Sequence, residues 1–193
     1  MTFKPTFQEV REVILNKGYK FFTGAYSINI IGIRCSLNKN IFDDTICILY
    51  YDAKHEEKIY YFPATTLAGH SWLKRLINPK GTFILKEGQF LGVYKEGLHK
   101  GRWGLVQNKP LPHYRDNNKD LNHDLKGEVH YGMCAANIHD TNGIESKYVN
   151  RWSAGCQVIN KNFDRFKAIC KMSFAKYGKI VSYTLINKND FSA

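Results

Sequence analysis

The residues best suited to chemistry lie in the last third of the chain. Asn137-Ile138-His139 is followed, 17 positions after the histidine, by the cysteine of Ser153-Ala154-Gly155-Cys156. A thiol becomes a useful nucleophile when a nearby imidazole takes its proton or stabilises its thiolate. The glycine lets the backbone bend so that amide N–H groups can face a developing oxyanion. On these residues alone, a packed histidine and an inert buried thiol remain the ordinary alternative.

The stretch from His139 to Cys156 resembles the signature of the L,D-transpeptidase (YkuD-like) family, which has an upstream His, a gap of this size and then Ser/Thr-x-Gly-Cys. The chain also resembles phage and prophage proteins with this domain, over roughly residues 26–187. The matching stretches are Ala64-Thr65-Thr66, Gly81-Thr82, Gly88-Gln89, Leu105-Val106-Gln107, Tyr114-Arg115-Asp116-Asn117, Asn137-Ile138-His139 and Trp152-Ser153-Ala154-Gly155-Cys156-Gln157-Val158.

The resemblance implies that Cys156 is the nucleophile and His139 its general base, with the Gly155-Cys156 backbone holding the oxyanion and Ser153 part of the same motif. Such enzymes attack the carbonyl at the L-centre of a diamino acid in a peptidoglycan stem peptide. The acyl-enzyme then passes to water or to an amine, and no metal or organic cofactor is needed. Asn137 shares a strand face with His139 by period two and is a candidate to orient the imidazole, although the family often uses a backbone carbonyl for this.

Two positions depart from the family pattern. Ala154 stands where the family usually has His, and Val158 stands where it usually has Arg or Asn. A substrate carboxylate therefore needs another partner, and we expect Arg151 or Gln157, with Arg115 behind them. Trp152 either flanks the cleft as a substrate platform or fills the core beneath the turn.

The elements that must position these residues follow from hydrophobic spacing and turn residues. A capping box at Thr6–Glu9 and an apolar face predict a helix over 6–17, and a second apolar face followed by Gly178 predicts a helix over 161–177. Short runs rich in Ile, Tyr, Phe and Thr predict strands. Their expected ranges are 28–34, 45–51, 58–63, 81–85, 88–93, 103–106, 132–139 and 179–186.

This pattern predicts a mainly β (α+β) fold, a sandwich or barrel with one flanking helix near each terminus, and the resemblance implies the L,D-transpeptidase-like version of it. We expect one catalytic domain over residues 1–193, with 1–20 as an N-terminal helical appendage. The N-terminus lacks the apolar core of a signal peptide, and no run is long enough to span a bilayer.

The charge of the chain and the spacing of its possible metal ligands limit the classes of binding partner that we expect. The formal net charge is +11, from 28 Lys+Arg and 17 Asp+Glu, which favours polyanionic partners such as an anionic cell-envelope surface. No helix-turn-helix, RNP-like or zinc-finger pattern supports nucleic acid. The five cysteines form no C-x-x-C pair, and His99, His113, His123 and His130 lack zinc-peptidase spacing. The calcium-like spacing of Asp116–Asp124 is interpreted as a solvated turn, since it lacks the Gly and Glu of an EF-hand.

The sequence thus predicts an endolysin-like cysteine hydrolase that cleaves stem-peptide or cross-link amide bonds of peptidoglycan. It is expected to be made in the cytoplasm and to reach the cell wall in the periplasm after holin release, or as a phage component. A transpeptidase that forms cross-links or exchanges D-amino acids is one alternative, and a non-catalytic basic binding module is another. A sortase-like enzyme fits less well, because it expects a much longer gap between His and Cys. The sequence does not indicate an oligomeric state.

Overall fold

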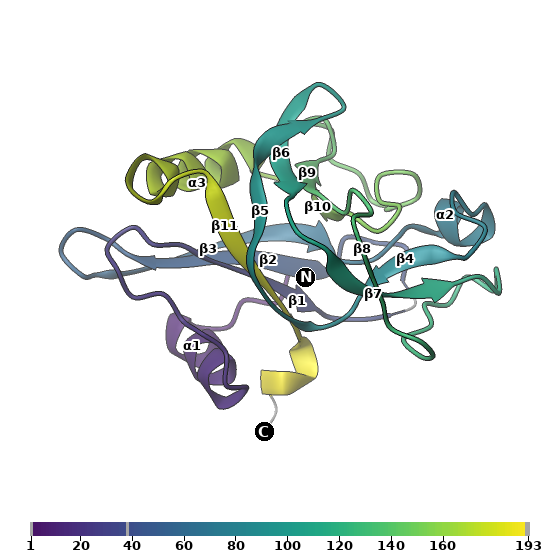
Figure 1. Ribbon diagram of the computed structural model, residues 1–193. Coiled ribbons are helices and arrows are strands. Elements are labelled where there is room, and N and C mark those ends of the chain that lie inside the picture. Colours follow the sequence, from purple (N-terminus) through teal and green to yellow (C-terminus); the bar gives the residue numbers. More distant parts are fainter. Residues whose placement is uncertain (1, 38, 192–193) are drawn as a thin grey trace.

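The computed structural model describes residues 2–37 and 39–191, and within them eight strands close into a barrel (Figure 1). Around the barrel the order is β1-β11-β5-β6-β9-β10-β3-β2, with parallel pairs only at β1–β11 and β9–β10. The bounds are β1 (Asn29–Arg34), β2 (Asp44–Tyr51), β3 (Glu57–Thr65), β5 (Gly88–His99), β6 (Arg102–Gln107), β9 (Ile138–Asp140), β10 (Gln157–Ile159) and β11 (Ile180–Asn187).

A smaller antiparallel sheet extends beyond one end of the barrel (Figure 1). It runs β4-β7-β8, with β4 (Thr82–Leu85), β7 (Leu111–Asp116) and β8 (His130–Gly132). The short helix α2 (His70–Lys74) lies at its far side, and η1 (Lys188–Phe191) follows the last strand. Because β7 follows β6 and β8 precedes β9 along the chain, this sheet stands beside the part of the barrel that carries His139.

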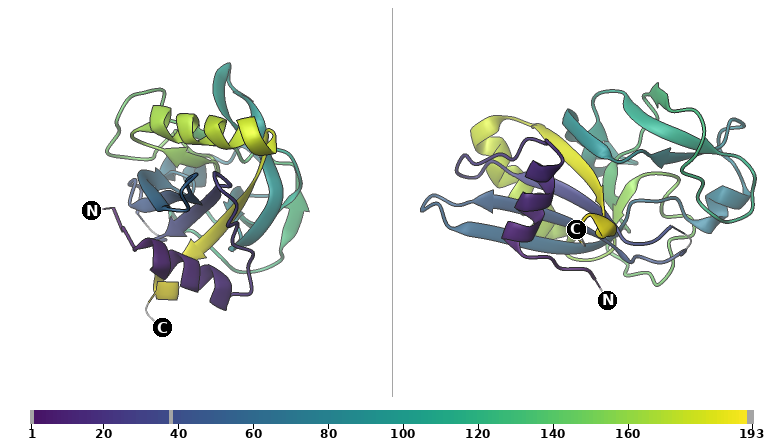
Figure 2. Two further views of the ribbon diagram at one scale, coloured as in Figure 1. Left: turned by 90° about the vertical axis from the view of Figure 1, so that its left-hand side faces the viewer. Right: turned by 90° about the horizontal axis from the view of Figure 1, so that it is seen from below.

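The helices α1 (Phe7–Asn16) and α3 (Phe163–Tyr177) lie on opposite sides of the barrel (Figure 2). The Thr6 side chain accepts from the Glu9 backbone, and the Glu9 side chain accepts from the Thr6 backbone, so the first turn of α1 has the reciprocal bonds of a capping box. At the end of α3 the Gly178 N–H donates to the carbonyl of Phe174, and φ of Gly178 is +81°, a conformation that favours glycine.

Two layers of apolar packing explain why strand β1 is buried along its whole length. Ile30 belongs to the main core with residues of α3, whereas Ile31 and Ile33 belong to a second cluster with α1. Successive side chains of a strand point to opposite faces, so a strand covered on both faces becomes continuously apolar. Helix α1 contributes Val10 and Ile14 to this second cluster, both fully buried.

The mainly β (α+β) fold with one helix near each terminus is confirmed. The expected single strand over 132–139 is wrong, because β8 ends at Gly132 and β9 begins at Ile138. Between them Ala135 has φ of +53°, and the Gln107 side-chain oxygen accepts from the backbone N–H groups of Cys134 and Ala136. The backbone between β8 and β9 is thus hydrogen-bonded to the Gln107 side chain instead of to a neighbouring strand. Strands β7 and β10 and helix α2 were not expected from the sequence.

Among the described residues, no helix combines the length and the apolar character needed to cross a membrane.

Candidate functional site

The register of two parallel strands brings Cys156 to His139. Gln157 of β10 pairs with Ile138 of β9, and the Gln157 N–H donates to the Asn137 carbonyl at 2.9 Å. Cys156, the residue before Gln157, is therefore level with Asn137 and lies beside the strand that carries His139. The long loop between the two strands folds back on itself, so residues 17 positions apart meet at one strand end.

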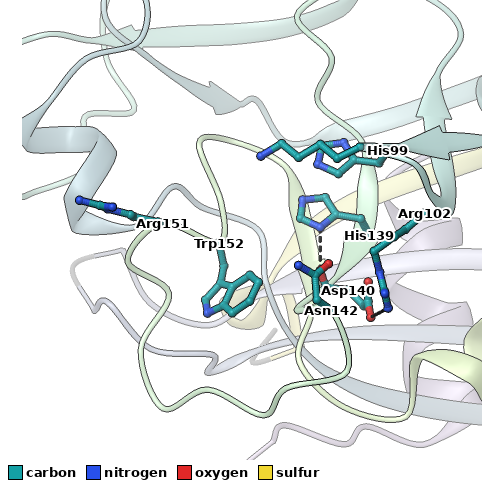
Figure 3. A pocket seen from close by; sticks show the side chains of 8 residues that line it. His99, Arg102, His139, Asp140, Asn142, Arg151 and Trp152 are labelled. Atoms are coloured by element: carbon teal, nitrogen blue, oxygen red, sulfur yellow. Dashed lines mark hydrogen bonds and ion pairs between the residues drawn. The ribbon is translucent and has the colours of Figure 1, made fainter.

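The backbone fixes the tautomer of His139. This side chain is only 8% exposed, and its Nδ1 lies 2.8 Å from the carbonyl oxygen of Asp140 (Figure 3). A carbonyl can only accept a hydrogen bond, so Nδ1 carries the proton and Nε2 presents a lone pair. An imidazole with a free Nε2 lone pair is what a general base for a thiol requires.

A second histidine, His99 at the end of β5, completes the cluster. Its ring stacks on that of His139 with centroids 4.1 Å apart and planes within 5° of parallel (Figure 3). One ring nitrogen of each histidine and the Cys156 sulfur all lie within 4.8 Å of one another. The cluster therefore joins β5, β9 and the turn before β10.

The side chain of Asn137 fixes the tautomer of His99 rather than that of His139. Its Oδ1 accepts the Gln107 backbone N–H at 2.9 Å, so the amide nitrogen is the group that faces His99 Nδ1 at 3.0 Å. Because the Asn137 amide nitrogen can only donate, His99 Nδ1 accepts and the ring proton of neutral His99 is on Nε2. The expected bond from Asn137 to His139 is thus wrong; the Asp140 carbonyl takes that place.

Both reacting groups rest in their neutral forms. Burial lowers the pKa of His139 to about 4, and the neighbouring His99 and Lys100 act in the same direction. Burial also raises the pKa of the Cys156 thiol, against smaller opposing effects of the Asn137 backbone and Lys100. The thiol donates to the carbonyl of Ala135 at 3.5 Å. The site therefore holds a thiol and a neutral base, not a preformed thiolate–imidazolium pair.

The turn that carries Cys156 is closed by Ser153. Its hydroxyl donates to the Cys156 carbonyl at 2.8 Å and accepts from the Gly155 N–H at 3.1 Å. Ser153 is fully buried, which makes it a structural residue of the turn. Since the Gly155 N–H already has this partner, it does not serve as the expected oxyanion donor, and the Cys156 N–H is the backbone donor left for that role.

Two pockets flank the turn. The first has a volume of about 260 Å³ and the second about 280 Å³. Trp152 lines the first and Ala154 the second, so alternate residues of the turn face different pockets. The first pocket, drawn in Figure 3, is lined by His99, Lys100, Arg102, His139, Asp140, Asn142, Arg151 and Trp152. Three of these eight side chains are basic, which suits a substrate that carries carboxylates.

The four predicted substrate-binding residues lie in three different places: the first pocket, the second pocket and the barrel core. Arg151 and Trp152 line the first pocket, and Arg115 lines the second. Gln157 is fully buried; its amide nitrogen donates to the Gly155 carbonyl, and its oxygen accepts from the Tyr183 hydroxyl. The prediction that Gln157 meets a substrate carboxylate is therefore wrong, since this side chain supports the turn from the barrel interior.

Three polar side chains of the Asp116–Asp124 loop accept hydrogen bonds from backbone groups of the same loop, whereas the His123 side chain bonds to the carbonyls of Leu37 and Ala68. Asn118 Oδ1 accepts from the Asp120 N–H, Asp120 Oδ1 from the Asn122 N–H, and Asp116 Oδ2 from the Asp124 N–H. These side-chain bonds to nearby backbone groups are typical of polar turns, in agreement with the interpretation of this segment as a turn.

The ring geometry argues against His99, His139 and Cys156 holding one metal ion as they stand. Zinc binds in the plane of an imidazole, about 2.0–2.1 Å from the nitrogen. The two rings are stacked and nearly parallel, so an ion in the plane of one lies well outside the plane of the other. The Nε2 proton of His99 is a second obstacle, because that nitrogen has no free lone pair.

Sequence reasoning found His139 and Cys156 but missed His99, Lys100 and Arg102. These residues surround the turn between β5 and β6, about forty positions before His139. No local motif marks them; only the pairing of β6 with β9, through Leu105 and Ile138, brings them to the site.

Comparisons with protein-family models, with curated proteins and with solved structures found no match. A neutral base with a fixed tautomer, a thiol, a backbone N–H and a pocket lined with basic side chains are groups that acyl transfer on a cysteine requires.

Proposed function

We propose that this protein is an endolysin-like cysteine hydrolase that cleaves amide bonds of peptidoglycan stem peptides or cross-links at the diamino acid. The observation that supports it best is the fixed tautomer of His139, together with the position of this histidine in one cluster with the Cys156 sulfur. The substrate class is supported by the resemblance of the His139–Cys156 motif and by the basic side chains of the first pocket.

In this proposal His139 Nε2 takes the thiol proton as the sulfur attacks the amide carbon. The Cys156 N–H and the Nε2–H of His99 are the donors for the oxyanion. The tetrahedral intermediate collapses, the C–N bond breaks, and His139 gives its proton to the leaving amine. A thioester on Cys156 remains, and water activated by the same Nε2 hydrolyses it and restores the thiol. Because both groups start neutral, proton transfer accompanies attack.

The two arginines of the first pocket have different roles in the proposed substrate binding. Arg102 is paired with Asp140 at 3.2 Å, so part of its charge is already engaged. Arg151 is exposed and lines the first pocket, and its carbonyl accepts from Trp72 Nε1 at 3.1 Å, which anchors its backbone. We assign Arg151 to a carboxylate of the stem peptide, and Trp152 beside it to the apolar part of the substrate.

The test is mass spectrometry of the muropeptides of purified Gram-negative peptidoglycan, which is incubated with the protein and then digested with a muramidase. Wild type is expected to remove terminal D-alanine or to open cross-links, and Cys156→Ala to do neither, since no other group in the cluster can form the acyl-enzyme. Cys35→Ser is the matched control, because Cys35 is a half-buried thiol with no imidazole contact in the described residues. The same muropeptide pattern after wild type and after Cys156→Ala would refute the proposal.

The products distinguish the alternatives. Loss of a terminal D-alanine or opened cross-links indicates hydrolysis, whereas new cross-links or exchanged D-amino acids indicate transpeptidation. No change that depends on Cys156, on several wall types, would favour a basic binding module, for which the net charge of +11 is the supporting observation.

A further inference from the structure

A second thiol outside the Cys156 site also has a basic environment. Cys134 is half-buried in the segment between β8 and β9. Its sulfur accepts from Arg115 Nη2 at 3.2 Å and lies 3.8 Å from His113 Nε2. His113 and Arg115 are two positions apart on β7, so the strand period places both on the face that meets Cys134.

His113 is held in the orientation of a base. Its Nδ1 lies 3.0 Å from the Leu111 carbonyl, so Nδ1 carries the proton and Nε2 presents a lone pair to the Cys134 sulfur. Burial, and to a smaller extent Arg115 and His130, lower the pKa of His113, which keeps the ring neutral near pH 7. The Phe83 ring stacks on the His113 ring, with 4.6 Å between centroids.

The cluster opens into the second pocket. Cys134, Arg115 and Met133 line this space of about 280 Å³ together with Ala154, from the turn that carries Cys156. A small molecule can therefore reach the thiol, and Arg115 offers a charged partner for a carboxylate on that molecule. Partly exposed thiols in electropositive surroundings are the reactive ones, and Arg115 supplies the positive charge beside Cys134.

We propose that Cys134 is a modification site, a second reactive thiol that exchanges with small carboxylate-bearing disulfides such as oxidised glutathione. The Cys134 sulfur attacks one sulfur of the disulfide, a new S–S bond forms and the old one breaks, and the other half leaves as a thiolate. His113 Nε2 takes the thiol proton and returns it to the leaving thiolate. The adduct occupies the second pocket, beside Ala154. The thiol exchange does not rest on the proposed function.

The chain supplies its own control in Cys35. This thiol is also half-buried, but burial together with Asp44 and Asp43 raises its pKa to about 12. The Cys35 sulfur donates to the Ile33 carbonyl at 3.8 Å, whereas the Cys134 sulfur contacts Arg115 and His113. The Cys156→Ala variant is used for the test, so that an adduct cannot pass between Cys134 and Cys156.

The experiment treats the folded Cys156→Ala protein with oxidised glutathione at pH 7 and follows each cysteine by peptide mass mapping over time. We expect Cys134 to react at least about tenfold faster than Cys35, and Arg115→Met to slow Cys134 by about tenfold. A Cys134 rate no greater than that of Cys35 would overturn the proposal, and so would an unchanged rate in Arg115→Met. The rates of Cys134 and Cys35 are compared in a protein that retains Arg115. This comparison therefore tests the proposal even if Arg115→Met folds poorly.

Discussion

At the level of single residues, hydrogen bonds to the backbone decide which nitrogen of each histidine can act. The Asp140 carbonyl leaves His139 with a free lone pair, and the Asn137 amide leaves His99 with a proton on Nε2. One ring is thus set to accept a proton and its stacked neighbour to donate a hydrogen bond. Neither role can be read from the residue types, because the same side chains with the opposite tautomers would serve neither purpose.

The pH dependence of the proposed reaction follows from the neutral state of His139. Its pKa is lowered to about 4, so Nε2 stays available as a base well below the ordinary histidine range. We expect the acidic limb of kcat/KM for muropeptide cleavage to have its midpoint near pH 4, with little loss between pH 7 and 5. Measuring cleavage from pH 3.5 to 8 checks this, and a midpoint near 6.5 would contradict the proposed environment of His139.

Replacing His99 by phenylalanine distinguishes the effect of its stacked ring from the effect of its Nε2–H donor. His99→Phe keeps a flat ring to stack on His139 but removes the Nε2 donor. If His99 donates to the oxyanion, this variant lowers kcat by about tenfold to a hundredfold with little change in KM. Steady-state kinetics on a purified muropeptide measure both constants. A fully active His99→Phe would reduce the role of His99 to stacking.

At the level of elements, the helices and most strands could be predicted, while the site could be predicted only in part. The capping box at Thr6 and the glycine at 178 mark helix ends by local chemistry, and α1 and α3 lie within two residues of their expected bounds. The ends of β8 and β9 depend instead on a non-local contact. Gln107, nearly thirty positions away, holds the backbone of the segment between them.

The same reason explains which site residues escaped prediction. His139 and Cys156 are close in sequence and form a motif, whereas His99 reaches them through the pairing of β6 with β9. Gln157 was misassigned because sequence position two residues after Gly155 does not reveal the side on which a side chain lies. In the barrel it faces inward, toward Tyr183.

The turn before β10 depends on glycine at position 155. Its φ is +123°, and a Cβ there would lie 2.7 Å from Phe83 Cδ1 and 2.8 Å from the Phe83 carbonyl oxygen. We therefore expect Gly155→Ala to lower the free energy of unfolding by about 3 kcal/mol, through backbone strain and overpacking together. Urea denaturation measures the change.

Gly143→Ala is the matched control for this prediction. Gly143 also has a positive φ, of +78°, but a Cβ at this position meets nothing within 4 Å. Only backbone strain remains, so we expect a loss of about 1 kcal/mol. Equal effects of the two substitutions would show that the contact with Phe83 does not constrain the turn.

At the level of the whole molecule, burying His139 links folding to pH. The unfolded chain binds a proton at this histidine near pH 6.5, whereas the folded protein does so only near pH 4. The unfolded state therefore binds more protons between these values. The stabilising contribution is complete above pH 6.5 and is lost as the pH falls toward 4, by about 3 kcal/mol in total.

His139→Gln isolates this contribution, because glutamine does not titrate. We expect urea unfolding between pH 7 and 4 to show a weaker loss of stability in His139→Gln than in wild type. Asp44 acts in the opposite sense in both proteins, since burial raises its pKa to about 6 and its neutral form favours the folded state at low pH. Parallel curves for the two proteins would contradict the lowered pKa of His139.

The most direct test of the account is to trap the acyl-enzyme. Wild type is mixed with a purified disaccharide-tetrapeptide, quenched in acid within the first turnovers, and examined by intact and peptide mass spectrometry. We predict a thioester on Cys156 whose added mass matches the disaccharide-tripeptide acyl group, that is, the substrate without its terminal D-alanine, and no such adduct in Cys156→Ala. Cleavage that continues in Cys156→Ala, or an acyl group on another residue, would contradict Cys156 as the nucleophile.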